Sequence, residues 1–124
     1  MDKSPERIAE ARAELSAQRA KAAVLRKEAD ALQAKANMAS KSYDMAYDWY
    51  TKAKAALTAA QNAARSTNSA KLATVIQVAQ KDLSDASRNL QSVRVHMDKC
   101  WSEYDLKNIE AKVAESYLPP PGWT

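Results

Sequence analysis

Apolar side chains recur every three or four residues over two long stretches of the chain. The first stretch runs from Ile8 to Ala64 with one polar interruption, Gln18, and the second runs from Leu72 to Leu118. This spacing places side chains on one face of an α-helix. The pattern predicts two amphipathic helices, over about residues 5–64 and 69–118. We call these positions the seam: Ile8, Ala11, Leu15, Gln18, Ala22, Leu25, Ala29, Leu32, Ala36, Ala39, Tyr43, Ala46, Tyr50, Ala53, Leu57, Ala60 and Ala64, then Leu72, Ile76, Ala79, Leu83, Ala86, Leu90, Val93, Met97, Cys100, Tyr104, Lys107, Ala111, Ala114 and Leu118.

The ends of both helices carry recognisable signals. Ser4 is a suitable N-cap, Pro5 fits the first helical position, and Glu6 lies in the first turn. Residues 65–69 (Arg-Ser-Thr-Asn-Ser) contain several turn formers and no apolar side chain, and Pro119 cannot continue the second helix. We therefore expect a turn at about residues 65–69.

A short link between two long helices favours an antiparallel pair. If the chain turns near residue 68, facing seam residues have numbers that add to about 136. This register often places alanine opposite a larger apolar residue, as in Ala53/Leu83 and Tyr50/Ala86. Alternating sizes fill a closely packed core, whereas a parallel homodimer would repeatedly face alanine with alanine. The predicted fold is all-α: a long antiparallel two-helix coiled-coil hairpin over residues 1–118.

The end of the hairpin away from the turn, its base, is predicted to pack less well. Three of its layers are poor: Ala29/Lys107, Ala22/Ala114 and Gln18/Leu118. A two-helix pair buries only one stripe per helix, so its stability is marginal. We expect the base either to fray or to be covered by another surface.

A second apolar stripe lies off the seam near the base of the second helix. Its members follow a spacing of three and four residues: Leu106, Ile109, Val113 and Tyr117. Scattered surface apolar residues are common, and they are one explanation. The other is a helix-packing interface with a protein partner, or with a second copy in a homo-oligomer.

Composition excludes most other fold classes. One glycine, no phenylalanine and 6% aromatic residues cannot supply the turns and strands of a β-sandwich or barrel, nor the glycine-rich turns of a doubly wound α/β fold. Cys100 is the only cysteine, so it forms no intramolecular disulfide or cysteine-based metal cluster, and it favours a reducing compartment. The chain shows no signal peptide or transmembrane run. We expect a complete small soluble protein in the cytoplasm or in a particle assembled there.

Charge is unevenly distributed along the chain. The net charge is +4, and residues 49–81 contain five basic side chains and no acid. This basic tip surface maps onto the turn end and adjoining shaft: Lys52, Lys54, Arg65, Lys71 and Lys81. Such a surface is either an ordinary solvated helix face or a contact for phosphates, acidic proteins or lipid headgroups.

Two aromatic side chains close to the tip lie beside the seam. Tyr47 and Trp49 flank it, whereas Tyr43 and Tyr50 belong to it. The pair either shields the narrow alanine-rich seam or forms a contact with a protein or with bases.

No pattern predicts catalysis, a cofactor or a metal. His96 is the only histidine, and Cys100, one turn later, occupies a seam position where a thiol behaves as a small hydrophobe. The carboxylate pairs Asp44/Asp48 and Asp82/Asp85 have a spacing expected on any solvated helix. No glycine-rich phosphate loop or Glu-x-x-His set is present.

The C-terminal tail, residues 119–124, has a different composition. Its three prolines favour an extended conformation, with Trp123 beyond the helix end. The tail either simply stops the helix, docks into a partner, or folds back over the base near Leu15.

These observations favour a non-enzymatic protein–protein interaction protein. Its role would be structural or adaptor-like within a larger assembly, such as a phage particle or secretion machine, or that of a small inhibitor. The candidate partner interface is Tyr47, Trp49, Leu106, Ile109, Val113, Tyr117 and Trp123. The alternative is a nucleic-acid-binding protein that uses the basic tip. Helical hairpins also serve as receptor-binding rods of bacteriocins, a remote third alternative based on shape alone.

Overall fold

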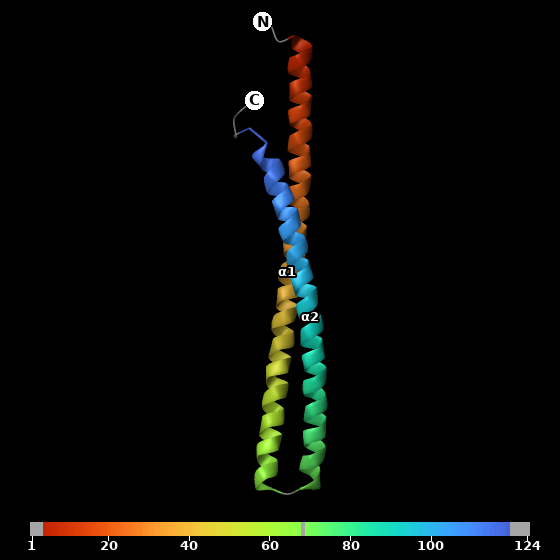
Figure 1. Ribbon diagram of the computed structural model, residues 1–124, viewed down its shortest axis with the longest axis vertical. Helices are drawn as coiled ribbons and strands as arrows, with labels where there is room; N and C mark the ends of the chain where they lie inside the picture. Colours follow the sequence, from red (N-terminus) through yellow and green to blue (C-terminus); the bar gives the residue numbers. More distant parts are fainter. Residues whose placement is uncertain (1–3, 68, 120–124) are drawn as a thin grey trace. The chain divides into compact units, whose positions relative to one another are not determined.

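The computed structural model describes residues 4–67 and 69–119. It contains two long helices packed against each other, α1 (Pro5–Ser66) and α2 (Ala70–Ser116), shown in Figure 1. About 95% of the described residues are helical and none lies in a strand. The predicted all-α helical hairpin is confirmed.

Capping interactions explain where the helices begin. The Ser4 hydroxyl accepts a hydrogen bond from the Arg7 amide at 3.3 Å, as predicted for an N-cap, and Ser69 Oγ accepts one from the Lys71 amide at 3.2 Å. Each bond satisfies an amide that has no partner within its helix. The first helix extends two residues further than expected, and the second ends two residues earlier, with a turn at Tyr117–Leu118. Asn68, predicted to lie in the turn, and residues 120–124 of the tail lie outside the described residues.

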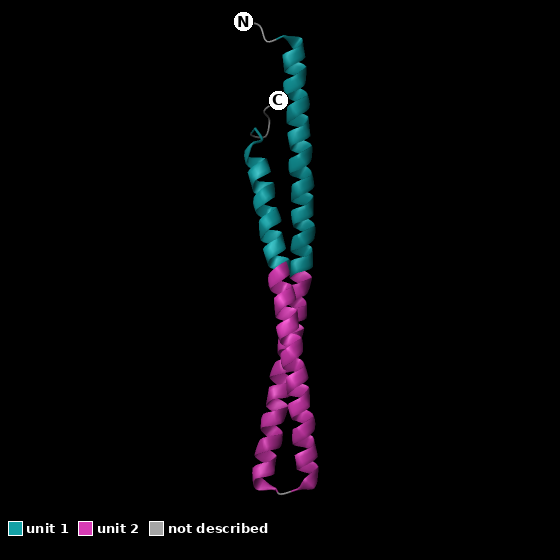
Figure 2. Cartoon of the chain, turned by 45° about the vertical axis from the view of Figure 1, so that its right-hand side comes forward, with its two compact units in different colours: residues 1–36, 100–124 teal, residues 37–99 magenta. Residues whose placement is uncertain are grey.

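The chain divides into two compact units (Figure 2). Unit 1 comprises residues 1–36 and 100–124, and unit 2 comprises residues 37–99. Each unit contains one segment of α1 and one segment of α2.

Burial follows the predicted seam in both units. The buried residues are all seam positions: Ala22, Ala29, Ala36, Ala39, Ala46, Ala53, Ala60, Ala86, Cys100 and Ala111. The larger seam residues, such as Leu32 and Leu83, are half-buried. Alanine therefore lies at the centre of the contact between α1 and α2, while the larger side chains lie over it and remain partly exposed to solvent.

Polar contacts between the helices agree with the predicted register. In unit 1, Arg26 bonds to Asn108 and Lys107 pairs with Glu28; in unit 2, Trp49 bonds to Asp82. In each of these three cases the two residue numbers add to within five of 136.

The first turns of α1 have no described α2 segment opposite them. In unit 1, α1 continues past the end of α2 (Figure 2). The seam positions Ile8 and Ala11 are accordingly exposed, Ile8 by 41%. The apolar stripe of α1 is therefore longer than its partner.

Candidate interaction surfaces

An apolar groove lies between α1 and α2 in unit 1, and we call it the base groove. It has a volume of about 540 Å³ and is lined by Gln18, Lys21, Leu25, Ile109, Glu110, Val113, Ala114 and Tyr117. Three of the four predicted stripe residues line it, whereas Leu106 does not. Tyr117 is 76% exposed and Leu106 66%, and both Ile109 and Val113 are at least half exposed.

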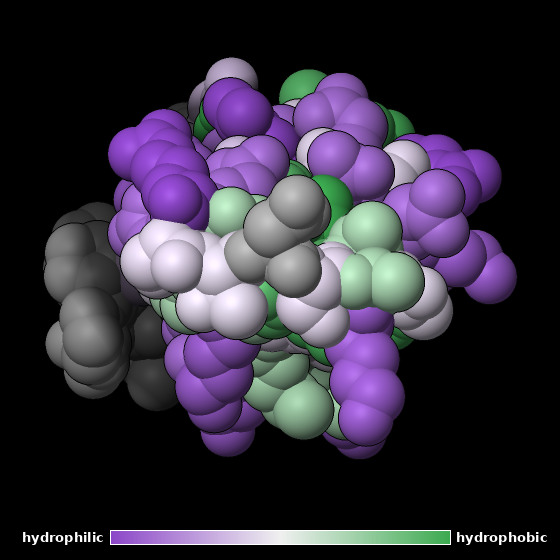
Figure 3. Space-filling model, turned by 90° about the horizontal axis from the view of Figure 1, so that it is seen from below, coloured by the Kyte–Doolittle hydropathy of each residue, from purple (hydrophilic) through white to green (hydrophobic). Residues whose placement is uncertain are grey.

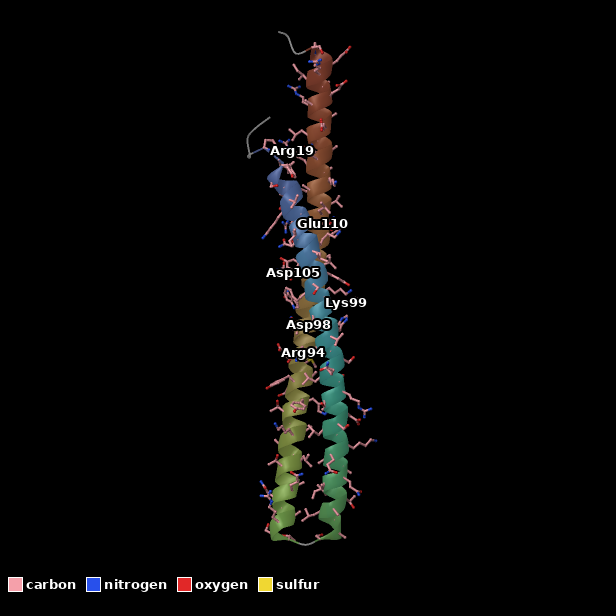
Figure 4. All side chains as sticks on the ribbon, viewed as in Figure 1. Arg19, Arg94, Asp98, Lys99, Asp105 and Glu110 are labelled. Carbon is pink, nitrogen blue, oxygen red and sulfur yellow. The ribbon has the colours of Figure 1, made fainter. Side chains whose placement is uncertain are left out.

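The base groove exists because the stripe is rotated away from the seam of α2. Ile109 and Val113 lie beside Ala111 and Ala114, and these small side chains let α1 approach closely without covering their neighbours. The lining includes one charge of each sign, Lys21 from α1 and Glu110 from α2; Figure 4 labels Glu110. Apolar side chains with a few charged neighbours are the usual composition of a protein-docking surface.

The opposite flank of unit 1 is polar. The Arg26 guanidinium donates two hydrogen bonds to the Glu115 carboxylate, from Nη2 to Oε1 at 2.7 Å and from Nε to Oε2 at 3.1 Å. Arg26 Nη1 also donates to Asn108 Oδ1 at 2.7 Å. These hydrogen bonds lower the pKa of the Glu115 carboxyl and raise that of Arg26, against the opposing effect of desolvation. The Arg26–Glu115 pair therefore joins α1 and α2 by two hydrogen bonds on the flank opposite the base groove.

Lys107 makes ion pairs at one of the three base layers that were expected to pack poorly. Its Nζ lies 3.3 Å from Glu28 Oε2 and 3.2 Å from Glu110 Oε2. Hydrogen bonds to Glu110 and Glu28 raise the pKa of Lys107. The opposite alanine, Ala29, is fully buried, so the aliphatic stem covers the seam while the ammonium reaches carboxylates on both helices.

Unit 2 contains a different surface, which we call the tyrosine–arginine groove. It is lined by Tyr43, Tyr47, Tyr50, Ser87, Arg88, Leu90, Gln91 and Arg94. The centroid of the Tyr47 ring lies 6.3 Å from the ring centroid of Tyr43 and 6.5 Å from that of Tyr50. Three aromatic rings from α1 thus face two guanidinium groups from α2; Figure 4 labels Arg94.

Trp49 makes a contact between the helices rather than standing apart from them. Its Nε1 donates to Asp82 Oδ1 at 3.2 Å, and the side chain is 38% exposed. The indole therefore bridges α1 and α2 beside the seam in unit 2, on the opposite side from the Tyr47 cluster.

The five residues of the basic tip surface are all exposed. Lys52 pairs with Asp48 at 2.9 Å, just outside the acid-free stretch. Figure 3 views the molecule from the turn end, and hydrophilic side chains surround that end on several sides. The structure does not concentrate the basic residues into one pocket among those described.

Candidate chemistry is sparse in the described ranges. Cys100 is buried at the seam, His96 is exposed, and no group of three or more metal-binding side chains occurs among residues 4–67 and 69–119. Asp48 and Asp85 form ion pairs with Lys52 and Arg88. Within the same part of the chain, neither helix combines the length and apolar character needed to cross a membrane.

The sequence reasoning did not identify several residues of these surfaces. Lys21 and Glu110 line the base groove, and Arg88 and Arg94 complete the tyrosine–arginine groove. The spacing of Lys21 from Gln18 and Leu25 was a usable signal, because residues three and four apart share a helix face. The convergence of Arg94 with Tyr47 depends on the rotation of both helices, which spacing within one helix does not give. Trp123, predicted as part of the partner interface, lies outside the described residues.

Comparison with known proteins finds no matching family model, no matching curated protein and no matching solved structure.

Proposed function

We propose that this chain is a non-enzymatic interaction protein that binds a helix of another polypeptide in the base groove of unit 1. The observation that carries the proposal is the groove itself: exposed Ile109, Val113 and Tyr117 beside half-buried Leu25, with two charged residues of opposite sign in its lining. Covering such side chains removes apolar surface from water, which is the main driving force of association.

The shape of the base groove favours a helix as the occupant. Two antiparallel helices present parallel ridges with a furrow between them, and a third helix can place an apolar stripe in that furrow. Such a docking surface would suit a structural or adaptor role in a larger assembly, such as a phage particle or secretion machine, or the role of a small inhibitor. The single cysteine is in keeping with the cytoplasm, or a particle assembled there.

Site-specific photo-crosslinking tests the proposal. A photoreactive residue replaces Val113 in the groove or, as a matched control, Val95, an exposed valine of α2 in unit 2. We expect a discrete crosslinked polypeptide at position 113, lost when Tyr117 is changed to Glu, and none at position 95. Absence of any crosslinked polypeptide at position 113 in the native cells contradicts the proposal.

The tyrosine–arginine groove favours a second candidate function, binding of single-stranded nucleic acid. Aromatic rings can stack with bases while arginines contact phosphates. Tyr47 supplies an exposed ring, and Arg94 supplies a guanidinium on the facing helix. The basic tip would add long-range attraction. The Arg88–Asp85 ion pair, at 2.8 Å, weakens this candidate because it offsets one of the two charges.

A further inference from the structure

The unpartnered start of α1 and the base groove lie in the same unit and complement each other. Ile8, Ala11 and Leu15 continue the seam stripe where no described α2 residue faces them. The groove begins one turn later, at Gln18 and Lys21. The start of α1 thus has an apolar stripe without a described partner, and the adjoining part of unit 1 contains the apolar base groove.

Charged residues of alternating sign lie along one flank of α1 and indicate which kind of surface would pair with it. Arg7, Glu14, Lys21 and Glu28 are seven residues apart, each immediately before a seam position. They therefore share the flank of α1 that borders the base groove, which Lys21 lines. Their charges are positive, negative, positive and negative.

This flank is self-complementary in one antiparallel register. If two copies of α1 lie antiparallel with these numbers adding to 35, Arg7 faces Glu28 of the second copy and Glu14 faces its Lys21. All four contacts then join opposite charges. A shift of seven residues in one direction brings Glu14 against Glu14, and a shift in the other brings Glu14 against Glu28. Both shifts place like charges together, which is unfavourable.

The same register fits the apolar positions. Seam positions of the two copies then face each other with numbers that add to 33, two less than on the flank, so Ile8 of one copy falls near the level of Leu25 of the other and Leu15 near the level of Gln18. Leu25 and Gln18 both line the base groove. Ile8, which is exposed, and Leu15, which is half-buried, would therefore enter the groove of the other copy, in a two-fold symmetric contact.

We propose that the occupant of the base groove is the first four turns of α1 from a second copy of this chain, bound antiparallel with Glu14 facing Lys21. The inference rests on the proposed docking role of the groove and names its partner. Neither Glu14 nor Lys21 makes an ion pair with another described residue, so both side chains are available for this contact.

Sedimentation velocity on the full chain at low salt tests the proposal. We expect a dimer, and we expect Val113→Glu to weaken it by at least about tenfold because a carboxylate would enter the apolar furrow. The matched variant Val95→Glu should leave the dimerisation constant unchanged. Circular dichroism checks that each variant keeps its helix content.

A charge swap tests the register without disturbing the apolar core. Glu14→Lys and Lys21→Glu each create two like-charge contacts and should each weaken the dimer about tenfold at low salt. The double variant restores opposite charges and should return the constant to within about threefold of the unmodified chain. Lys54→Glu, an exposed change in unit 2, serves as the control.

Three results would overturn the inference: a monomer at about 100 µM, a dimer insensitive to Val113→Glu, or single charge changes that the double variant does not rescue. The crosslinking experiment separates these failures from failure of the proposed function. A monomer that still crosslinks to a different polypeptide at position 113 keeps the docking role and rejects the second copy. A monomer without any crosslink rejects both.

Discussion

Enlarging a buried alanine of the seam gives a quantitative test of its packing. Ala36 is fully buried and Cys100, at the same level of unit 1 in the predicted register, is 2% exposed. Ala36→Leu adds an isopropyl group where neither helix leaves space. Overpacking of this kind costs about 1–3 kcal/mol. Since each kcal/mol lowers Tm by about 4–8 °C in a small domain, we expect Tm to fall by roughly 4–24 °C.

The matched control is Ala34→Leu, an identical substitution on the exposed face of the same helix. Alanine and leucine have similar helix propensities, so its effect should stay within about 0.5 kcal/mol. Thermal and guanidinium unfolding, followed by circular dichroism at the helix band, measure both variants. Equal stabilities for the two would refute the close packing described at the seam.

A compensating change sharpens the test. Combining Ala36→Leu with Cys100→Ala removes the cysteine sulfur and so makes room for the leucine. The layer then again pairs one large residue with one small residue. We expect the double variant to be more stable than the sum of the single effects predicts, by at least about 1 kcal/mol. Additive effects would indicate that the two side chains do not share a layer.

Three further predictions concern charge, capping and ligand class. Because Arg26 lowers the pKa of Glu115, the stabilisation from this carboxylate is complete above the ordinary pKa of 4.5 and is lost as the pH falls through the lower folded-state value. Thermal melts between about pH 6 and pH 2 should therefore show a larger loss of stability for the unmodified chain than for Glu115→Gln. Parallel curves of Tm against pH for the two proteins would contradict this. Removing the α2 cap with Ser69→Ala should cost about 1 kcal/mol in guanidinium unfolding, whereas Ser92→Ala, at an exposed site within α2, should be neutral or slightly stabilising. If the chain binds single-stranded nucleic acid, affinity measured by fluorescence anisotropy should fall steeply as the salt concentration rises. Replacing both arginines of the tyrosine–arginine groove with alanine should reduce the slope of log affinity against log salt concentration by about one to two units. No binding at about 50 mM salt would reject this candidate.

The seam could be predicted because helix periodicity and close packing use the same residues. Ala29 and Ala86, both fully buried, occur at predicted positions. The turn was also predictable, since residues 65–69 lack apolar side chains. These features depend on spacing along one helix and on the number of residues in the connection.

The lateral surfaces were less predictable, because they depend on which side chains converge from two helices. Lys107 occupies a seam position that looked unfavourable, yet its ammonium reaches Glu28 and Glu110. The Arg26–Glu115 pair likewise joins residues far apart in sequence, and ion pairs have no periodic signature. The stripe from Leu106 to Tyr117 was visible in the sequence, but only the structure shows that α1 supplies Leu25 and Lys21 to complete a groove.

The short connection between α1 and α2 has a consequence for how the chain folds. Seam pairs beside the connection close loops of only a few residues, and the entropic cost of closure rises with loop length. We expect pairing to start at the turn and spread along both helices, so that unit 2 forms before unit 1. During synthesis the whole of α1 precedes its partner, leaving its alanine stripe exposed until α2 emerges from the ribosome. An alanine side chain has little apolar surface, so an exposed alanine stripe should promote aggregation less than a stripe of leucines would. We therefore expect the nascent chain to depend little on chaperones.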